Sequence, residues 1–288
     1  MSNRNLAARI APNAAYHIER VNWVRHWNEH LFSFALTRPP SLRFRSGEFV
    51  MLGLPRVISS QMESSCDSEI RENKDSSRPI LRAYSIASPA YADEVEFLSI
   101  KVPEGPLTSR LQQVRPGDEV YLARKTTGTL VTDALTPGKR LFLLATGTGL
   151  APFLSIIRDP DVYDRFAQVV VVHSVRRVSD LAYRNELTGL LAGDPLVQDQ
   201  ALVQLSYIPT VTREPFPTQK RITALMQEPE LFRTTAGEKR LDPSQDRVML
   251  CGSMDMIRDC QAILERLGFQ EGSNAKPGDY VIEKAFAG

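Results

Sequence analysis

The chain has 288 residues, which is enough for one large domain or two ordinary ones with a substantial core. Its 35 basic and 34 acidic residues nearly cancel to a formal charge of +1, which argues against a general nucleic-acid binder. No apolar run approaches the ~20 residues that a membrane span requires, and the N-terminus lacks the apolar core of a secretory signal.

Short strand-like runs fill the first half of the chain. Six of them are separated by turn signals: YHIERVNWV, HLFSFALT, GEFVMLGL, LRAYSIAS, VEFLSIKV and DEVYLARK. Between the last two, Leu107, Leu111 and Val114 recur at helical spacing and predict one short helix. Six strands and one helix predict a small antiparallel barrel with a capping helix.

Residues 56–79 interrupt this pattern. The segment is polar, serine-rich and charged, without usable periodicity, and is predicted to be a surface loop inserted in the barrel. It contains Cys66, which is either an exposed redox thiol or an incidental loop cysteine. None of the three cysteines has metal-ligand spacing, so no bound metal is expected, and their odd number favours a reducing cytoplasmic location over a disulfide framework.

The pattern changes near residue 137. RLFLLAT, QVVVVHSV, ALVQLSYIPTV, RVMLCGS and DYVIEKAF are predicted as strands, and they alternate with helical patterns that include VSDLAYRNELTGLL and MIRDCQAILERLGF. This alternation is typical of a parallel sheet covered by helices. We therefore predict a barrel domain over residues 14–137 and a parallel-sheet, nucleotide-binding α/β domain over residues 138–288.

A glycine-rich loop follows the first of these strands. ATGTGLAPF places Gly147 and Gly149 between a buried strand and a helix, with Pro152 suited to the first helical turn. Glycines let the backbone approach a pyrophosphate, and a helix N-terminus favours negative charge. The same pattern also fits a tight strand-to-helix turn that binds nothing.

Arginines follow the next strands at the same expected edge of the sheet. Arg176 comes after QVVVVHSV, Arg213 follows the third strand and Arg221 precedes the next helix. Guanidinium groups form charge-assisted, bidentate hydrogen bonds with phosphates, so the set favours the 2′-phosphate of NADP. Each arginine taken alone also fits an ordinary solvated charge.

Several ordered motifs together resemble the ferredoxin–NADP⁺ reductase family, in its bacterial flavodoxin/ferredoxin reductase subclass. They are RAYSIASP, SIKVPEGPLTSRLQ, RKTTGTLV, ATGTGLAPFLS, VTRE, MLCGS and DYVIEKAF. The resemblance implies that the barrel binds FAD and that the parallel-sheet domain binds NADP(H).

The resemblance also implies roles for single residues around the flavin. Tyr84 would stack on the isoalloxazine ring, Arg82 would pair with the FAD pyrophosphate, and Ser85 would hydrogen-bond near flavin N5. The backbone of Ile100, Lys101 and Val102 would line the flavin. Further FAD contacts are implied for Ala83, Gly105, Leu107, Thr108, Ser109, Thr148, Ala285, which would face the ring, and Phe286, which would stack on the adenine.

For NADP, the matching motifs imply a pyrophosphate site from Thr146 to Pro152, including Gly147, Thr148 and Gly149, and a 2′-phosphate site at Arg176, Arg213 and Arg221. Cys251 and Gly252 would lie beside the nicotinamide, although a buried cysteine at a strand end is usually a small apolar residue. Glu283 is either a proton-handling group near the flavin or an ordinary strand-end carboxylate.

The implied activity is hydride exchange between NADP(H) and FAD, coupled to single-electron exchange with ferredoxin or flavodoxin. These acidic carriers would need a basic surface, for which the candidates are Arg110, Arg115, Arg124 and Lys125. Two alternatives stay open: an NAD(P)H–flavin reductase that serves an oxygenase or another acceptor, and a non-catalytic flavin or nucleotide sensor.

Overall fold

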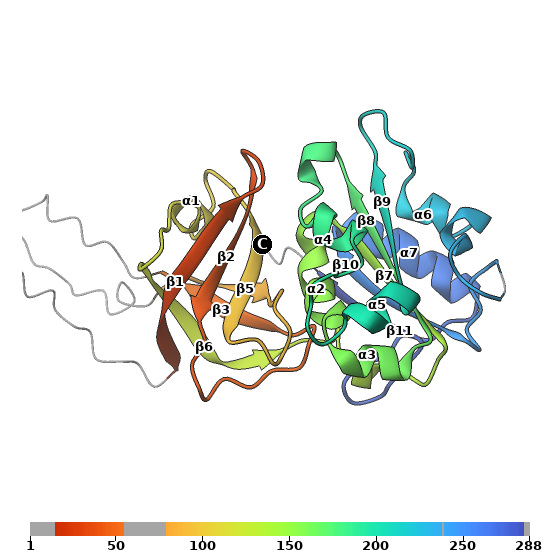
Figure 1. Cartoon of the computed structure of the whole chain (residues 1–288), viewed down its shortest axis with the longest axis horizontal. Coiled ribbons are helices and arrows are strands. Elements are labelled where there is room, and N and C mark those ends of the chain that lie inside the picture. Colours follow the sequence, from red (N-terminus) through yellow and green to blue (C-terminus); the bar gives the residue numbers. More distant parts are fainter. Residues whose placement is uncertain (1–14, 55–78, 238, 285–288) are drawn as a thin grey trace, which may run out of the picture.

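The computed structural model describes residues 15–54, 79–237 and 239–284. Figure 1 shows two halves side by side, an antiparallel barrel and a parallel sheet with its helices. The strands of the barrel half lie between residues 16 and 127, and those of the parallel-sheet half lie between residues 140 and 284. The change of pattern in the sequence near residue 137 falls between these two sets of strands.

All six strands predicted in the first half are present and pair antiparallel. They are β1 (Tyr16–His26), β2 (Leu31–Thr37), β3 (Phe49–Gly53), β4 (Leu81–Ser85), β5 (Glu94–Ile100) and β6 (Glu119–Thr127), in the sheet order β4-β3-β6-β1-β2-β5. A bridge between Ile86 and Phe97 connects the two ends of the sheet. The predicted helix is α1 (Thr108–Leu111), whose Leu111 is fully buried in the barrel core with Phe32 and Phe34.

The second half contains the predicted parallel sheet. Its strands are β7 (Arg140–Thr146), β8 (Gln168–Val175), β9 (Leu205–Val211), β10 (Asp246–Gly252) and β11 (Tyr280–Lys284), in the order β11-β10-β7-β8-β9. The chain starts in the centre at β7, moves outward to β9 and returns on the other side of β7 to β10. The order therefore reverses between β7 and β10, which is where open parallel sheets usually bind ligands, at the carboxyl ends of the strands.

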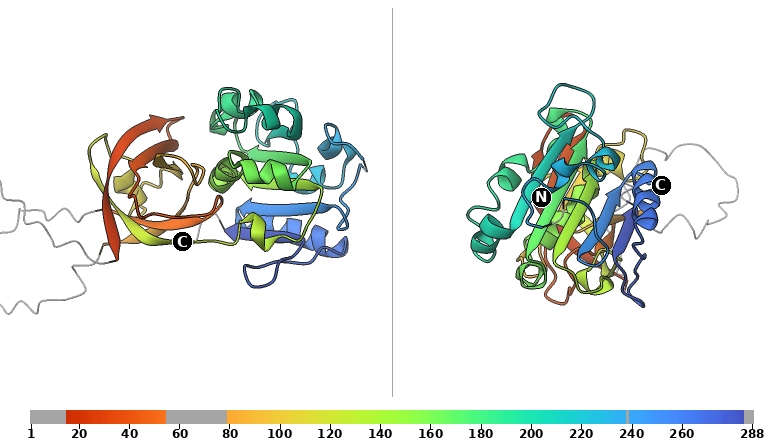
Figure 2. Two further views of the ribbon diagram at one scale, coloured as in Figure 1. Left: turned by 60° about the horizontal axis from the view of Figure 1, so that its bottom comes forward. Right: turned by 90° about the vertical axis from the view of Figure 1, so that its right-hand side faces the viewer.

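Helices cover both faces of this sheet (Figure 2). One face packs against α2 (Ala151–Ile157), α3 (Pro160–Arg165), α4 (Arg184–Thr188) and α5 (Gln198–Gln204). The other face packs against α6 (Ile222–Leu225) and α7 (Met254–Arg266). Short 3₁₀ turns complete the half: η2 (Thr132–Ala134), η3 (Gly147–Leu150), η4 (Val178–Asp180) and η5 (Pro229–Phe232). Within the described ranges, no helix has both the length and the apolar character to cross a bilayer.

Two predictions for the second half are wrong in detail. The helix expected over residues 178–191 is divided into η4 and α4, because Tyr183, Leu190 and Leu191 adopt left-handed backbone angles of φ 56°, 50° and 58°. The strand expected from Ala201 begins only at Leu205, since residues 198–204 form α5. In the first place burial of Tyr183 and Leu191 against neighbouring elements outweighs the local periodicity. In α5 only Ala201 is buried, whereas Leu202 and Val203 are exposed.

Candidate functional site

The glycine-rich loop lies at the carboxyl end of β7, beside the reversal point of the sheet. After Thr146 the chain forms η3 and then α2, with Pro152 in the first turn, as predicted. Gly147 has φ 55°, and a side chain placed there would meet no atom within 4 Å. The backbone of the loop is therefore open to a ligand at Gly147.

At Gly149, in contrast, the loop presses against the end of β10. A Cβ atom on Gly149 would lie only 2.3 Å from the carbonyl oxygen of Cys251. Gly252 has φ 151°, and a Cβ there would lie 2.0 Å from Thr146 Oγ1. Thr146 Oγ1 in turn accepts a hydrogen bond from the Ser253 N–H at 2.9 Å. The two glycines are thus required for the close approach of the loops that follow β7 and β10.

His173, which was not among the predicted site residues, contacts the backbone of the same loop from the neighbouring strand β8. It is a fully buried residue of β8, and its Nε2 lies 3.1 Å from the carbonyl oxygen of Gly147. Burial lowers the pKa of His173 to about 4, so the ring is neutral near neutral pH and its Nε2–H donates to that carbonyl. A histidine directly after four consecutive valines in QVVVVHSV was the signal that could have drawn attention to it.

Three of the predicted catalytic side chains meet where the two halves join. Ser85 ends β4 of the barrel, and its hydroxyl donates to Glu283 Oε1 at 3.3 Å. Glu283 lies in β11 opposite Cys251 of β10 in the parallel register. Residues about 200 positions apart therefore share one site, at the carboxyl ends of two neighbouring parallel strands.

Burial dominates the electrostatics of this group. It raises the pKa of Glu283 to about 7, with the Glu48 carboxylate adding to the increase and hydrogen bonds from Thr129 and Ser85 opposing it. Glu283 Oε2 is buried and has no hydrogen-bond partner among the described residues. Burial and the nearby Glu283 also raise the pKa of the fully buried Cys251 thiol. The Cys251 thiol is consequently uncharged near neutral pH, and Glu283 is the group that changes charge there.

The RAYS motif forms β4, an end strand of the six-stranded sheet. Arg82 and Ala83 are exposed, whereas Tyr84 is 9% exposed and packs edge-on against Phe97, with ring centroids 6.3 Å apart. Burial raises the pKa of the Tyr84 phenol. Because most of the Tyr84 ring lies in the barrel core, its stacking on a flavin stays a prediction.

The residues of SIKVPEGPLTS line a bend between β5 and α1. Ile100 ends β5, and Lys101 and Val102 begin the bend, with the Thr108 hydroxyl donating to the Val102 carbonyl at 3.2 Å. Gly105 leaves no room for a side chain, since its Cβ would lie 2.1 Å from Thr108 Oγ1. Leu107 is 2% exposed and therefore offers almost no surface to a ligand, and Ser109 lies within α1.

The predicted phosphate-binding arginines come from neighbouring strand ends. Arg176 follows β8 and Arg213 follows β9, and the Arg213 N–H donates to the Arg176 carbonyl at 3.0 Å. Arg221 directly precedes α6, and its neighbour Lys220 bonds through its backbone to the Thr210 hydroxyl of β9. All three arginines are exposed, and no ion pair to their guanidinium groups occurs in the described part of the chain.

Some predicted residues fall outside the described ranges. They are Ala285 and Phe286 at the end of the chain and Cys66, together with nearly all of the 56–79 segment. The roles assigned to them stay predictions.

Comparison with known proteins gives consistent matches. Residues 143–262 match the family described as "Oxidoreductase NAD-binding domain". The chain is 49% identical to a "Ferredoxin--NADP reductase" of Pseudomonas aeruginosa, over 93% of this chain and 96% of the relative. It is 46% identical to a "Flavodoxin/ferredoxin--NADP reductase" of Rhodobacter capsulatus, over 98% of this chain and 96% of the relative.

A solved structure is also similar across both halves. It is a ferredoxin NADP⁺ reductase of Neisseria gonorrhoeae with bound FAD and NADP, at 29% identity and a TM-score of 0.79. The match covers 95% of this chain and 100% of that one. The likeness therefore extends over the barrel, the parallel sheet and the junction that carries Ser85 and Glu283.

Proposed function

This chain belongs to the ferredoxin–NADP reductase family, and from that premise we propose that it uses bound FAD to exchange electrons between NADP(H) and ferredoxin. One observation carries the proposal. The glycine-rich loop after β7, Cys251 at the end of β10, and the Ser85–Glu283 pair converge at the junction of the two halves. A redox site that joins a flavin to a nicotinamide needs residues from both binding halves at one place.

The residues present fit FAD at the barrel end of this site. As an end strand, β4 has one edge without a strand partner in the described ranges. The backbone N–H and C=O groups on that edge can hydrogen-bond to the polar edge of a flat ring. Glu283 Oε2 is buried and lacks a hydrogen-bond partner among the described residues, so a polar ligand atom could bond to it there. We propose that Arg82, whose guanidinium is exposed, neutralises the FAD pyrophosphate.

NADP(H) would occupy the carboxyl ends of β7, β8 and β9. The open backbone at Gly147 suits its pyrophosphate, and the unpaired guanidinium groups after β8 and β9 suit its 2′-phosphate. The nicotinamide would then lie near Cys251, whose small, uncharged side chain excludes water without adding charge.

When bound, FAD supplies the conversion between two-electron exchange with a nicotinamide and one-electron exchange with an iron–sulfur protein. The chain itself contributes position and electrostatics. Ser85 holds one Glu283 oxygen at 3.3 Å, and Glu283 can take up or release a proton at about pH 7. An ionised Glu283 would favour the positive charge that a nicotinamide acquires when it loses hydride.

Ferredoxin is the carrier named for both relatives, and one of the two names flavodoxin beside it. The candidate docking residues Arg115, Arg124 and Lys125 are exposed, on the loop after α1 and on β6, and Arg110 lies in α1 itself. Long-range attraction from such side chains accelerates the encounter with an acidic protein. Flavodoxin as a second carrier and a cytoplasmic location stay predictions.

Anaerobic reduction tests the proposal. The purified protein should be yellow, NADPH should bleach it, and the NADPH-reduced enzyme should reduce ferredoxin in a side-by-side assay with flavodoxin. A colourless protein, or a yellow one that NADPH cannot bleach, would favour a sensor. Bleaching without transfer to either carrier would favour a flavin reductase for another acceptor.

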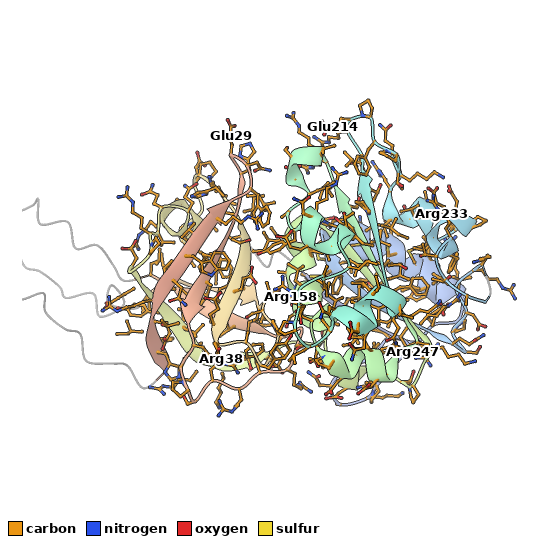
Figure 3. The ribbon with its side chains drawn as sticks, in the orientation of Figure 1. Glu29, Arg38, Arg158, Glu214, Arg233 and Arg247 are labelled. Carbon is orange, nitrogen blue, oxygen red and sulfur yellow. The ribbon has the colours of Figure 1, made fainter. Side chains whose placement is uncertain are left out.

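Replacing Arg213 with alanine should raise the KM for NADPH about 10- to 100-fold, because a charge-assisted hydrogen bond to a phosphate is lost. The KM for NADH should stay within about twofold, since NADH has no 2′-phosphate. Arg233→Ala is the matched control, because Arg233 pairs with Glu230 in the outer part of the parallel-sheet half (Figure 3). Equal losses with NADPH and NADH would remove Arg213 from the 2′-phosphate site.

A further inference from the structure

A second buried polar network joins the two halves. Its centre is Tyr183, which is 3% exposed and belongs to the parallel-sheet half. The Tyr183 hydroxyl lies 2.6 Å from Ser33 Oγ of β2 and 2.6 Å from Glu96 Oε1 of β5. Because the phenol has one proton and a carboxylate only accepts, this proton goes to Glu96, which is itself 8% exposed.

The second oxygen of the same carboxylate binds another element of the parallel-sheet half. Arg158, the C-cap residue that follows α2, donates to Glu96 Oε2 at 3.1 Å. Figure 3 shows Arg158 between the two halves. One barrel carboxylate is therefore held by two side chains from across the junction. Breaking a buried, hydrogen-bonded ion pair costs far more than breaking an exposed one.

Aromatic packing fixes the position of Tyr183 further. Its ring contacts that of Trp27 with centroids 4.6 Å apart, and Trp27 Nε1 donates to Ser33 Oγ at 2.8 Å. Arg25 covers the Trp27 ring and pairs with Glu186 of α4 at 2.9 Å. Tyr183 itself has φ 56°, a left-handed conformation that is unfavourable for a residue other than glycine. The contacts with the barrel hold it there.

The elements held by this network are those that carry the nucleotide site. Helix α2 begins at the glycine-rich loop and ends at Ile157, directly before Arg158, and the segment that contains Tyr183 follows Arg176 at the end of β8. We infer that Tyr183, Glu96 and Arg158 are positioning residues, which set the angle between the halves so that the nicotinamide meets the flavin. This inference rests on the proposed function.

The test is Tyr183→Phe, which removes only the hydroxyl. The rate of flavin reduction by NADPH in a single anaerobic turnover should fall about 10-fold, because small misplacements of reacting groups are costly. The long-wavelength charge-transfer absorbance of the nicotinamide–flavin pair should weaken in parallel. The Kd of 2′-phosphoadenosine 5′-phosphate should stay within about twofold, since that fragment contacts only the parallel-sheet half.

Tyr163→Phe is the matched control. Tyr163 is 4% exposed, and its hydroxyl donates to the Ile157 carbonyl at 2.6 Å inside the same half. It should lower the melting temperature to a similar degree without changing the charge-transfer absorbance or the reduction rate. Glu96→Gln, which keeps the size of the side chain, should reproduce the Tyr183→Phe effect and replaces it if that variant does not fold.

Unchanged reduction and absorbance in both Tyr183→Phe and Glu96→Gln would overturn the inference alone. Equal kinetic losses in Tyr163→Phe would also overturn it, because a general loss of stability would then explain the result. A wild-type protein that NADPH cannot bleach would overturn the proposed function and this inference together.

Discussion

Replacing Gly149 with alanine is expected to destabilise the protein by about 3 kcal/mol and to abolish most NADP binding. The new methyl group would lie 2.3 Å from the Cys251 carbonyl oxygen and 2.6 Å from its carbonyl carbon. Both are backbone atoms of a central strand, so they cannot move as a flexible side chain would. The loop after β7 or the end of β10 must shift, and the proposed nucleotide site lies between them.

Chemical denaturation measures the loss of stability, and calorimetric titration with NADP⁺ measures the loss of binding. Gly147→Ala is the matched control in the same loop, because a side chain at Gly147 meets no atom within 4 Å. Its φ of 55° should cost only about 1 kcal/mol. Similar stabilities for the two variants would show that the contact with Cys251 is not the constraint on Gly149.

Replacing Glu283 with glutamine should remove a pH dependence from both stability and catalysis. In the unfolded chain this carboxyl loses its proton near its ordinary pKa of 4.5, whereas in the folded protein burial raises the pKa to about 7. The folded state therefore binds more protons in this window. The contribution of Glu283 to stability is therefore fully present below pH 4.5 and is lost as the pH rises to about 7.

The unfolding free energy of Glu283→Gln, relative to wild type, should thus rise between these pH values by up to about 3 kcal/mol. Denaturation at a series of pH values measures it. Glu271→Gln is the control, since Glu271 is an exposed carboxylate outside the site. A constant difference across the series would show that Glu283 has an ordinary pKa in the folded protein.

The substitution should slow flavin reduction at the same high pH at which it increases stability relative to wild type. Above pH 7, where wild-type Glu283 is ionised, the variant should reduce its flavin with NADPH about 10- to 100-fold more slowly. Below pH 6 or so the two proteins should converge, because both side chains are then neutral. Parallel pH profiles would exclude Glu283 as the group that assists the nicotinamide and would leave it a strand-end carboxylate.

Much of the fold could be predicted because strand and helix periods are local. Alternation in HLFSFALT and VEFLSIKV, and the unbroken apolar run RLFLLAT, correctly identified β2, β5 and β7. The failures lie where a distant contact outweighs the local pattern. Residues 178–191 read as one helix, but Tyr183 turns left-handed where it bonds to Ser33 and Glu96 of the barrel.

The candidate site also has some features that were predictable from the sequence and others that were not. The chain by itself specified its chemistry: glycines where the backbone approaches a neighbour, a proline in the first turn of α2, and arginines after β8 and β9. Those features depend on residue type and on order along the chain. Only the tertiary structure decided that Ser85 and Glu283 come within 3.3 Å. It also decided that one Glu283 oxygen has no hydrogen-bond partner among the described residues, and that burial raises the pKa of Glu283. A proton affinity depends on what surrounds the group, and those surroundings come from strands almost 200 residues apart.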